Sequence, residues 1–245
     1  MSNKISNDFA KKILSFNFSN SNFFTSSVFP DPLVTSSFSN NKPYIEISNF
    51  KNANIVAVSK TFPIGHILPL INHGHQHFGE NKVQEAQEKW TSLKNDFPNL
   101  KLHLIGKLQT NKVKFALPLF DYIHSLDSIK LAEKISLEQK KKNFKPKIFI
   151  QINLGKENQK SGIDEDDLEN FYQKCVTEYN LNIIGIMCLP PFDEDPNPFF
   201  KKMQNLSESL KLKEISMGMS NDYMDALKFN ATYIRVGSKI FGNRS

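Results

Sequence analysis

The stretch from residue 147 to residue 189 reads KIFIQINLGKENQKSGIDEDDLENFYQKCVTEYNLNIIGIMCL. Its two ends, KIFIQINLG and NIIGIMCL, are almost continuously apolar and rich in β-branched residues, which is typical of strands buried on both faces. Between them, the residues after Asp164 have helical spacing, and Asp is a preferred residue at a helix start. The stretch therefore predicts a strand–helix–strand unit with parallel strands.

The same unit repeats in both directions along the chain. Helical segments begin after Asn81, Asn111, Asp127, Pro196 and Asn221. Eight strands alternating with helices predict an α/β fold, a single (β/α)₈ TIM-type barrel. A doubly wound open sheet is the alternative, and it is less favoured because no Gly-rich dinucleotide motif follows the first strand. The predicted strands are 54–59, 75–80, 101–106, 121–126, 147–155, 182–189, 214–218 and 232–237.

Residues 1–45 differ from the rest of the chain. They are crowded with Ser, Asn and Phe and show neither a helical nor a strand period. We interpret them as an irregular, partly ordered N-terminal extension and expect the barrel domain to span residues 46–245. A targeting peptide is the alternative, but the cations of this stretch are Lys rather than Arg and it lacks a compact apolar core.

The overall composition is that of an ordinary globular protein. The 245 residues are 39% hydrophobic and 23% charged, and no apolar run approaches the length of a membrane-spanning helix. Two cysteines are too few for a disulfide framework, so we expect a reducing, cytoplasmic location. The net charge is +6, but the lysines are spread along the chain and interleaved with acids, which argues against a nucleic-acid partner.

Two local clusters, one basic and one rich in histidine, resemble a nucleic-acid patch and a metal site, but we assign neither function to them. The run KKKNFKPK at 140–147 is basic, but we interpret it as the cationic end of a helix rather than as a nucleic-acid patch. The run HGHQH at 73–77 alternates histidines. No carboxylate or cysteine at ligand spacing completes a metal set, so we interpret it as the polar entry to a strand.

In a barrel, functional sites form where the strands end at their carboxyl side. Lys60 directly follows the first strand. Burial disfavours an ammonium ion, which lowers the pKa of a lysine and frees its amine to condense with an aldehyde. On position alone, a surface lysine that only ends a strand is the favoured interpretation, because the chain has many lysines.

Turns of small residues follow the last two strands, as SMGMSND at 216–222 and RVGSKIFGN at 235–243. Barrels often bind phosphate at these two turns. Because closure places the eighth strand beside the first, an amine next to a phosphate cradle points to pyridoxal 5′-phosphate, a phosphorylated aldehyde. Arg235 lies within an apolar strand and needs a buried partner: the pyridine nitrogen, or a carboxylate such as Asp222 or Asp225.

At these residues the sequence resembles the pyridoxal phosphate homeostasis proteins, which share the barrel of the alanine racemase N-terminal domain. The resemblance covers nearly everything from residue 54 to residue 242, in order. The matching stretches are IVAVSKTFP, HFGENKVQEA, LHLIGKLQTNK, HSLDS, IQINLGKENQKSGI, GIMCLPP, ISMGMSNDYMDA and IRVGSKIFG.

The resemblance implies a role for each residue of the site. Lys60 would carry the vitamin B6 cofactor pyridoxal phosphate as a Schiff base, and Arg235 would face the pyridine nitrogen. An arginine there cannot keep that nitrogen protonated, so the cofactor would be a weak electron sink. The phosphate would be held by Ser220 with the turn of Gly237 and Ser238. Asn81 and His103 are similar to further pocket residues of the family.

Two residues depart from the family pattern. Lys82 stands where an aromatic residue usually follows FGEN in the family, so we expect the wall of the pocket to differ there. Lys239 stands where the last motif commonly has Ala. The N-terminal region also differs from the first helix of the family.

The resemblance favours a carrier over an enzyme. An alanine racemase needs two opposed acid/base groups, the cofactor lysine and a tyrosine supplied by a further domain, and this chain ends at Ser245, soon after the eighth strand. We therefore expect a pyridoxal phosphate-binding protein that buffers or delivers the cofactor without an established turnover reaction. Its expected partners are apo-enzymes that need the cofactor, and we expect a monomer. A small single-domain amino-acid racemase that depends on the same cofactor is the alternative.

Overall fold

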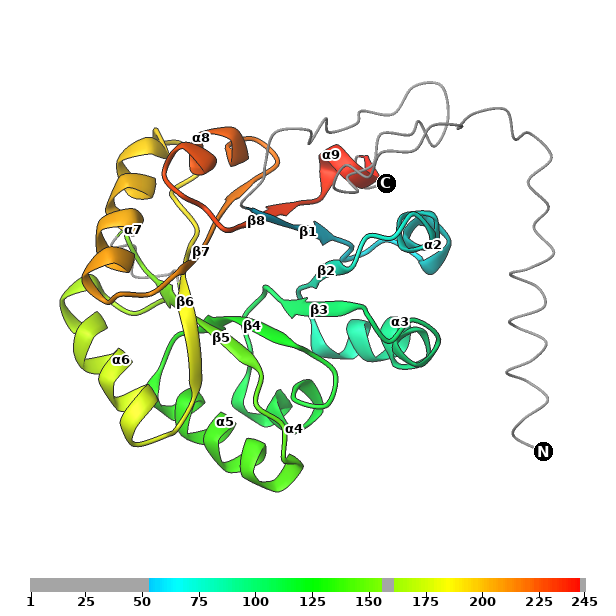
Figure 1. Cartoon of the computed structure of the whole chain (residues 1–245), viewed down its shortest axis with the longest axis horizontal. Coiled ribbons are helices and arrows are strands. Elements are labelled where there is room, and N and C mark those ends of the chain that lie inside the picture. The colour runs from blue at the N-terminus through cyan, green and yellow to red at the C-terminus, as the bar shows by residue number, and fades with distance from the viewer. Residues whose placement is uncertain (1–52, 156–160, 243–245) are drawn as a thin grey trace. The chain divides into compact units, whose positions relative to one another are not determined.

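A computed structural model of the chain describes residues 53–155 and 161–242. In this part of the chain, eight parallel strands close into a barrel in sequence order (Figure 1). The closing pair is β1 with β8, where Val56 lies opposite Arg235. The predicted barrel is confirmed and the open sheet is wrong, because an open sheet would leave two unpaired edges. The strands are β1 (Asn54–Val58), β2 (His77–Glu80), β3 (Lys101–Leu104), β4 (Tyr122–Leu126), β5 (Lys147–Ile152), β6 (Asn182–Cys188), β7 (Glu214–Met219) and β8 (Tyr233–Val236).

Helices lie outside the ring of strands, and Figure 1 shows them following one another around it. None of the helices in the described residues is long and apolar enough to cross a membrane. The predicted extension at 1–45 lies outside the described residues. The helices are α2 (Ile64–Asn72), α3 (Val83–Asp96), α4 (Val113–Ala116), α5 (Ile129–Lys142), α6 (Leu168–Thr177), α7 (Asn197–Ser209), α8 (Tyr223–Lys228) and α9 (Ser238–Phe241), with 3₁₀ turns η1 (Thr110–Lys112) and η2 (Glu165–Asp167).

The structure corrects several predicted element boundaries. Helix α5 is capped by Ser128, whose Oγ accepts from the Leu131 N–H, one residue beyond the predicted start. Strand β2 begins at His77, two residues later than the histidine run suggests. Helix α2 is absent from the predicted elements, because Gly65 and Pro69 both weaken the helical signal.

The barrel separates two cores. The larger core lies between the strands and the helices, where Phe78, Trp90 and Phe120 are fully buried. The smaller core fills the barrel interior with Val56, Tyr122, Phe149, Met187 and Tyr233. This interior also holds buried polar side chains, and these form much of the site described below.

Strand β7 ends against α8 at a position that only glycine fits. Gly218 has a φ of +87°, and an added Cβ would lie 2.7 Å from Ala226 Cβ and 2.9 Å from Tyr223 Cα. The register of β7 against β8 shifts at this point. A left-handed glycine at such an irregularity redirects the chain, and the residues that follow form the turn that contains Ser220.

Candidate functional site

Lys60 lies in the tight turn that joins β1 to α2. The turn is closed by the Phe62 N–H, which donates to the Ser59 carbonyl at 3.1 Å. Thr61 has a φ of +67°, an uncommon value for a β-branched residue. Lys60 itself is half-buried between the buried Ser59 and the exposed Thr61. The predicted lysine therefore lies at the carboxyl mouth of the barrel, in a strained turn that other residues must hold.

A buried polar cluster from β2 and α3 holds this turn. Lys89 Nζ donates to the carbonyls of Ser59 and Phe62 at 2.9 and 3.3 Å, and forms ion pairs with Glu80 at 2.9 Å and Glu85 at 2.8 Å. Glu85 Oε1 also accepts from the backbone N–H of Thr61. The turn that presents Lys60 is thus fixed from outside the strand ring.

Glu80 joins this cluster to the core. Its Oε1 accepts from Ser59 Oγ at 2.8 Å and from Trp90 Nε1 at 3.0 Å, and its side chain is fully buried. Glu80 is marked by the sequence only as a polar residue that ends the second apolar run, and no sequence pattern marks Lys89 or Trp90 as residues of the site. The available signal is Lys89 itself, a lysine on the same helical face as Val83, Ala86 and Leu93.

The two small-residue turns meet, as the sequence predicts. The backbone N–H of Gly237 donates to Ser220 Oγ at 3.3 Å. An added Cβ at Gly237 would lie 3.3 Å from both the Cβ and the carbonyl oxygen of Val58, so this turn packs directly on the end of β1. Ser238 is exposed. The turns after β7 and β8 and the turn after β1 therefore form one continuous mouth.

Arg235 is buried inside the barrel, and its partners differ from the predicted carboxylates. Its guanidinium donates to Ser216 Oγ at 2.6 Å and to the Cys188 carbonyl at 2.9 Å. Asp222 accepts instead from the Met219 N–H. Burial lowers the pKa of Arg235, although a guanidinium remains protonated at neutral pH. The site thus has a fixed, buried cation held by neutral acceptors.

Asn81 and His103 occupy different levels of the barrel. Asn81 follows β2 and is half-buried at the mouth. Gly106 passes so closely that an added Cβ would lie 2.4 Å from the Asn81 carbonyl oxygen. His103 is fully buried in β3, and both of its ring nitrogens lie 2.9 Å from a nitrogen of another imidazole. Asn81 therefore lines the mouth, whereas His103 lies deeper and has no ring nitrogen left to offer a ligand.

Lys82 and Lys239, the two residues that depart from the family pattern, lie at the start of α3 and in α9. Lys82 is exposed in extended backbone before α3. Lys239 is half-buried in α9, with its ammonium 5.0 Å from the centre of the Tyr223 ring. No group of histidine, cysteine or acidic side chains among the described residues is placed to hold a metal ion.

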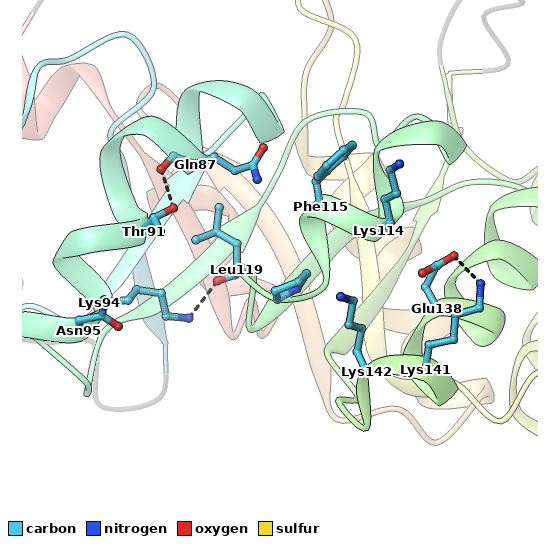
Figure 2. Close-up of a pocket in the computed structure, with 11 residues that line it drawn as sticks. Gln87, Thr91, Lys94, Asn95, Lys114, Phe115, Leu119, Glu138, Lys141 and Lys142 are labelled. Atoms are coloured by element: carbon cyan, nitrogen blue, oxygen red, sulfur yellow. Dashed lines mark hydrogen bonds and ion pairs between the residues drawn. The ribbon is translucent and has the colours of Figure 1, made fainter. Parts of the chain in front are cut away.

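A hollow of about 880 Å³ lies on the outer surface between α3, α4 and α5. Figure 2 shows Lys94, Phe115 and Lys142 around it. Its lysines are partly engaged, because Lys94 pairs with Asp121 and Lys141 with Glu138. The hollow lies among the helices rather than at the strand ends, so it is separate from the mouth that contains Lys60.

Comparison with known proteins shows which class of barrel domain this chain belongs to. The family model for the alanine racemase N-terminal domain matches residues 44–245. An alanine racemase from Clostridium difficile 630 shares the fold, with a TM-score of 0.63 at 15% identity over 79% of this chain and 53% of that chain. The class is thus the barrel of the alanine racemase N-terminal domain type.

More similar proteins narrow the class to a family. The pyridoxal phosphate homeostasis protein of Aquifex aeolicus is 36% identical over 201 residues, which cover 78% of this chain and 87% of that protein. PipY of Synechococcus elongatus PCC7942, solved with PLP bound, has a TM-score of 0.73 at 35% identity over 78% of this chain and 93% of that chain. The chain belongs to the pyridoxal phosphate homeostasis protein family.

Proposed function

We propose that this protein binds pyridoxal 5′-phosphate at the mouth that contains Lys60 and buffers or delivers the cofactor inside the cell. The observation that carries the proposal is that the three turns meet. The Gly237 N–H donates to Ser220 Oγ, and the Gly237 Cα packs so closely on Val58 that an added Cβ would lie 3.3 Å from its carbonyl oxygen. An amine from the β1 turn and an anion cradle from the last two turns thus share one mouth. The solved relative PipY with PLP bound supports the same assignment.

The residues present fit the cofactor. When bound, pyridoxal phosphate supplies an aldehyde that a lysine amine can capture as a Schiff base, and a pyridine ring that withdraws electrons. Lys60 would hold the aldehyde end, Ser220 with Gly237 and Ser238 the phosphate, and Arg235 the pyridine nitrogen. Asn81 would line the mouth beside them. A permanently protonated guanidinium cannot give a proton to the pyridine nitrogen, which favours binding over turnover.

The tyrosines inside the barrel support a carrier rather than a racemase. The hydroxyls of Tyr122 and Tyr233 are 3.5 Å apart in the buried interior. Burial raises the pKa of Tyr233, so its hydroxyl stays protonated at neutral pH and is not available to accept a proton from a substrate. We place the protein in the cytoplasm as a monomer that supplies apo-enzymes, with its barrel domain beginning at residue 46.

The assignment is tested by absorbance between about 300 and 500 nm on purified protein, before and after borohydride reduction. A band at about 420 nm that reduction removes is expected for wild type and for Lys107→Ala, a control lysine that also follows a barrel strand. Lys60→Ala should lack the band. A wild-type protein without the band after addition of pyridoxal phosphate would overturn the proposal.

A second experiment separates carrier from racemase. The cofactor-loaded protein is incubated with L-alanine in deuterated water, and loss of the α-proton signal is followed by NMR. No exchange above the rate of free pyridoxal phosphate is expected. Exchange that depends on Lys60 would replace the carrier proposal with the racemase alternative.

A further inference from the structure

A continuous chain of buried polar side chains crosses the barrel interior. Arg235 Nη1 donates to Ser216 Oγ at 2.6 Å, and this oxygen lies 2.9 Å from His124 Nδ1. His124 Nε2 lies 2.9 Å from His103 Nδ1, and His103 Nε2 lies 2.9 Å from His77 Nδ1. The chain joins β8, β7, β4, β3 and β2. It ends at His77, the half-buried first residue of β2, at the amino end of the barrel and therefore opposite the mouth that contains Lys60.

Packing holds the rings of this chain in place. His103 stacks on Tyr122, with ring centres 4.1 Å apart and planes 12° apart. His124 stacks on Phe149 at 4.3 Å and 26°. Burial lowers the pKa of His103 and of His124 well below the ordinary value. Both rings are therefore neutral at physiological pH, and each can donate one hydrogen bond and accept one.

The fixed charge at one end sets the direction of every bond. The Arg235 guanidinium can only donate, so Ser216 Oγ must accept from it. Ser216 is fully buried, and its hydroxyl hydrogen would lack a partner unless it donates to His124 Nδ1. An unmade buried hydrogen bond is costly, so His124 should carry its proton on Nε2. The same logic places the protons of His103 and His77 on Nε2.

We propose that Ser216, His124, His103 and His77 are positioning residues for Arg235. This inference deepens the proposed function and rests on it, because Arg235 is the residue assigned to the pyridine nitrogen. The Cys188 carbonyl accepts from one end of the guanidinium at 2.9 Å, so the acceptor at the other end, Ser216 Oγ, decides the orientation of its plane. The chain presents it with one oriented acceptor that is anchored on four other strands, so its remaining N–H groups keep a constant direction toward the cofactor site.

The first test reads the tautomers in the cofactor-free protein and does not depend on the proposed function. Long-range ¹H–¹⁵N NMR on histidine-labelled wild type at about pH 7.5 should show His77, His103 and His124 neutral and protonated on Nε2. Ser216→Ala should disturb the single tautomer of His124, and Ser216→Thr should restore it. A wild-type His124 or His103 protonated on Nδ1 would refute the proposed direction of the hydrogen bonds.

The second test measures binding and the absorbance spectrum of pyridoxal phosphate. Ser216→Ala should weaken binding about tenfold and shift the bound-cofactor band, while Ser207→Ala, a buried serine of α7 with one hydrogen bond, should not. His77→Phe, at the amino end of the barrel, should weaken binding about threefold. His75→Phe is its control, because the buried His75 ring bonds the backbone carbonyl of His77 at 2.8 Å and contacts no imidazole nitrogen of the chain.

The outcomes of these tests can be told apart. Wild type that fails to bind pyridoxal phosphate overturns the proposed function. Wild type that binds, together with a His77→Phe variant that is indistinguishable from His75→Phe, overturns the positioning chain alone. If Ser216→Ala does not fold, the wild-type tautomers and the Ser216→Thr variant still decide the inference.

Discussion

Replacement of Lys89 by methionine tests whether the α3 cluster holds the turn that presents Lys60. The Glu80 side chain is fully buried, and Lys89 is only 11% exposed. Loss of one partner from a buried ion pair costs about 3–5 kcal/mol, because the other charge is left uncompensated. The pair with Glu85 adds little, since Glu85 is partly solvated. We therefore expect Lys89→Met to lower the free energy of unfolding by about 3–5 kcal/mol.

The assay is urea unfolding followed by tryptophan fluorescence. Trp90 is the single tryptophan of the chain, and its indole N–H donates to Glu80, so the probe lies within the cluster. Lys228→Met removes an exposed ion pair with Asp225 and should cost less than about 1 kcal/mol. In the double variant Lys89→Met, Glu80→Gln, the buried charge is absent, so part of the lost stability should return.

The same variants connect stability to the site. Because Lys89 binds both carbonyls that flank the Lys60 turn, Lys89→Met should also weaken pyridoxal phosphate binding, whereas Lys228→Met should not. A loss of stability below about 1 kcal/mol in Lys89→Met, or strict additivity in the double variant, would refute this reasoning.

Three further predictions concern positions elsewhere in the barrel. Gly106→Ala should lose about 1–3 kcal/mol in urea unfolding, because its Cβ would meet a backbone oxygen at 2.4 Å; Gly65→Ala, with open space around it, should lose none. Burial lowers the pKa of His75 and His77 from 6.5 to about 4. The unfolded chain therefore binds protons first, and the free energy of unfolding should fall as pH drops from 6.5 to 4, by on the order of 3 kcal/mol per imidazole; unfolding curves that coincide across this range would contradict it. Burial raises the pKa of the Cys188 thiol to about 12, so a thiol reagent should label it only as the protein unfolds, and labelling of folded protein at the rate of a free thiol would show otherwise.

Local patterns in the sequence predict most of the fold. Strands β5 and β6 are nearly continuous apolar runs, and the helix between them has its own start signal, so the parallel unit is visible without any tertiary information. Helix α2 escapes this reasoning because Gly65 and Pro69 weaken the only local signal it has. Packing against the strands outweighs that low propensity in the folded chain.

The sequence also predicts part of the site. Lys60, Ser220 and Gly237 follow strands, and the rule that barrel sites form at strand ends is enough to place them at one mouth. The rule about strand ends does not predict the hydrogen-bond partners of Arg235, which lies within a strand. The sequence offers the pyridine nitrogen of a cofactor, or a carboxylate such as Asp222 or Asp225, whereas the structure gives the guanidinium a hydroxyl from β7 and a carbonyl from β6.

The sequence by itself determined the order of strands and helices, the closure expected from eight repeats, and the residues that end each strand. Only the tertiary structure decided which buried polar groups contact one another. Lys89 reaches Ser59 across 30 positions of the chain, and His124 reaches Ser216 across 92. The periodicity of apolar residues in the sequence indicates only the local conformation of a few residues. These contacts depend on strand register and barrel closure, which are set by the packing of the whole domain.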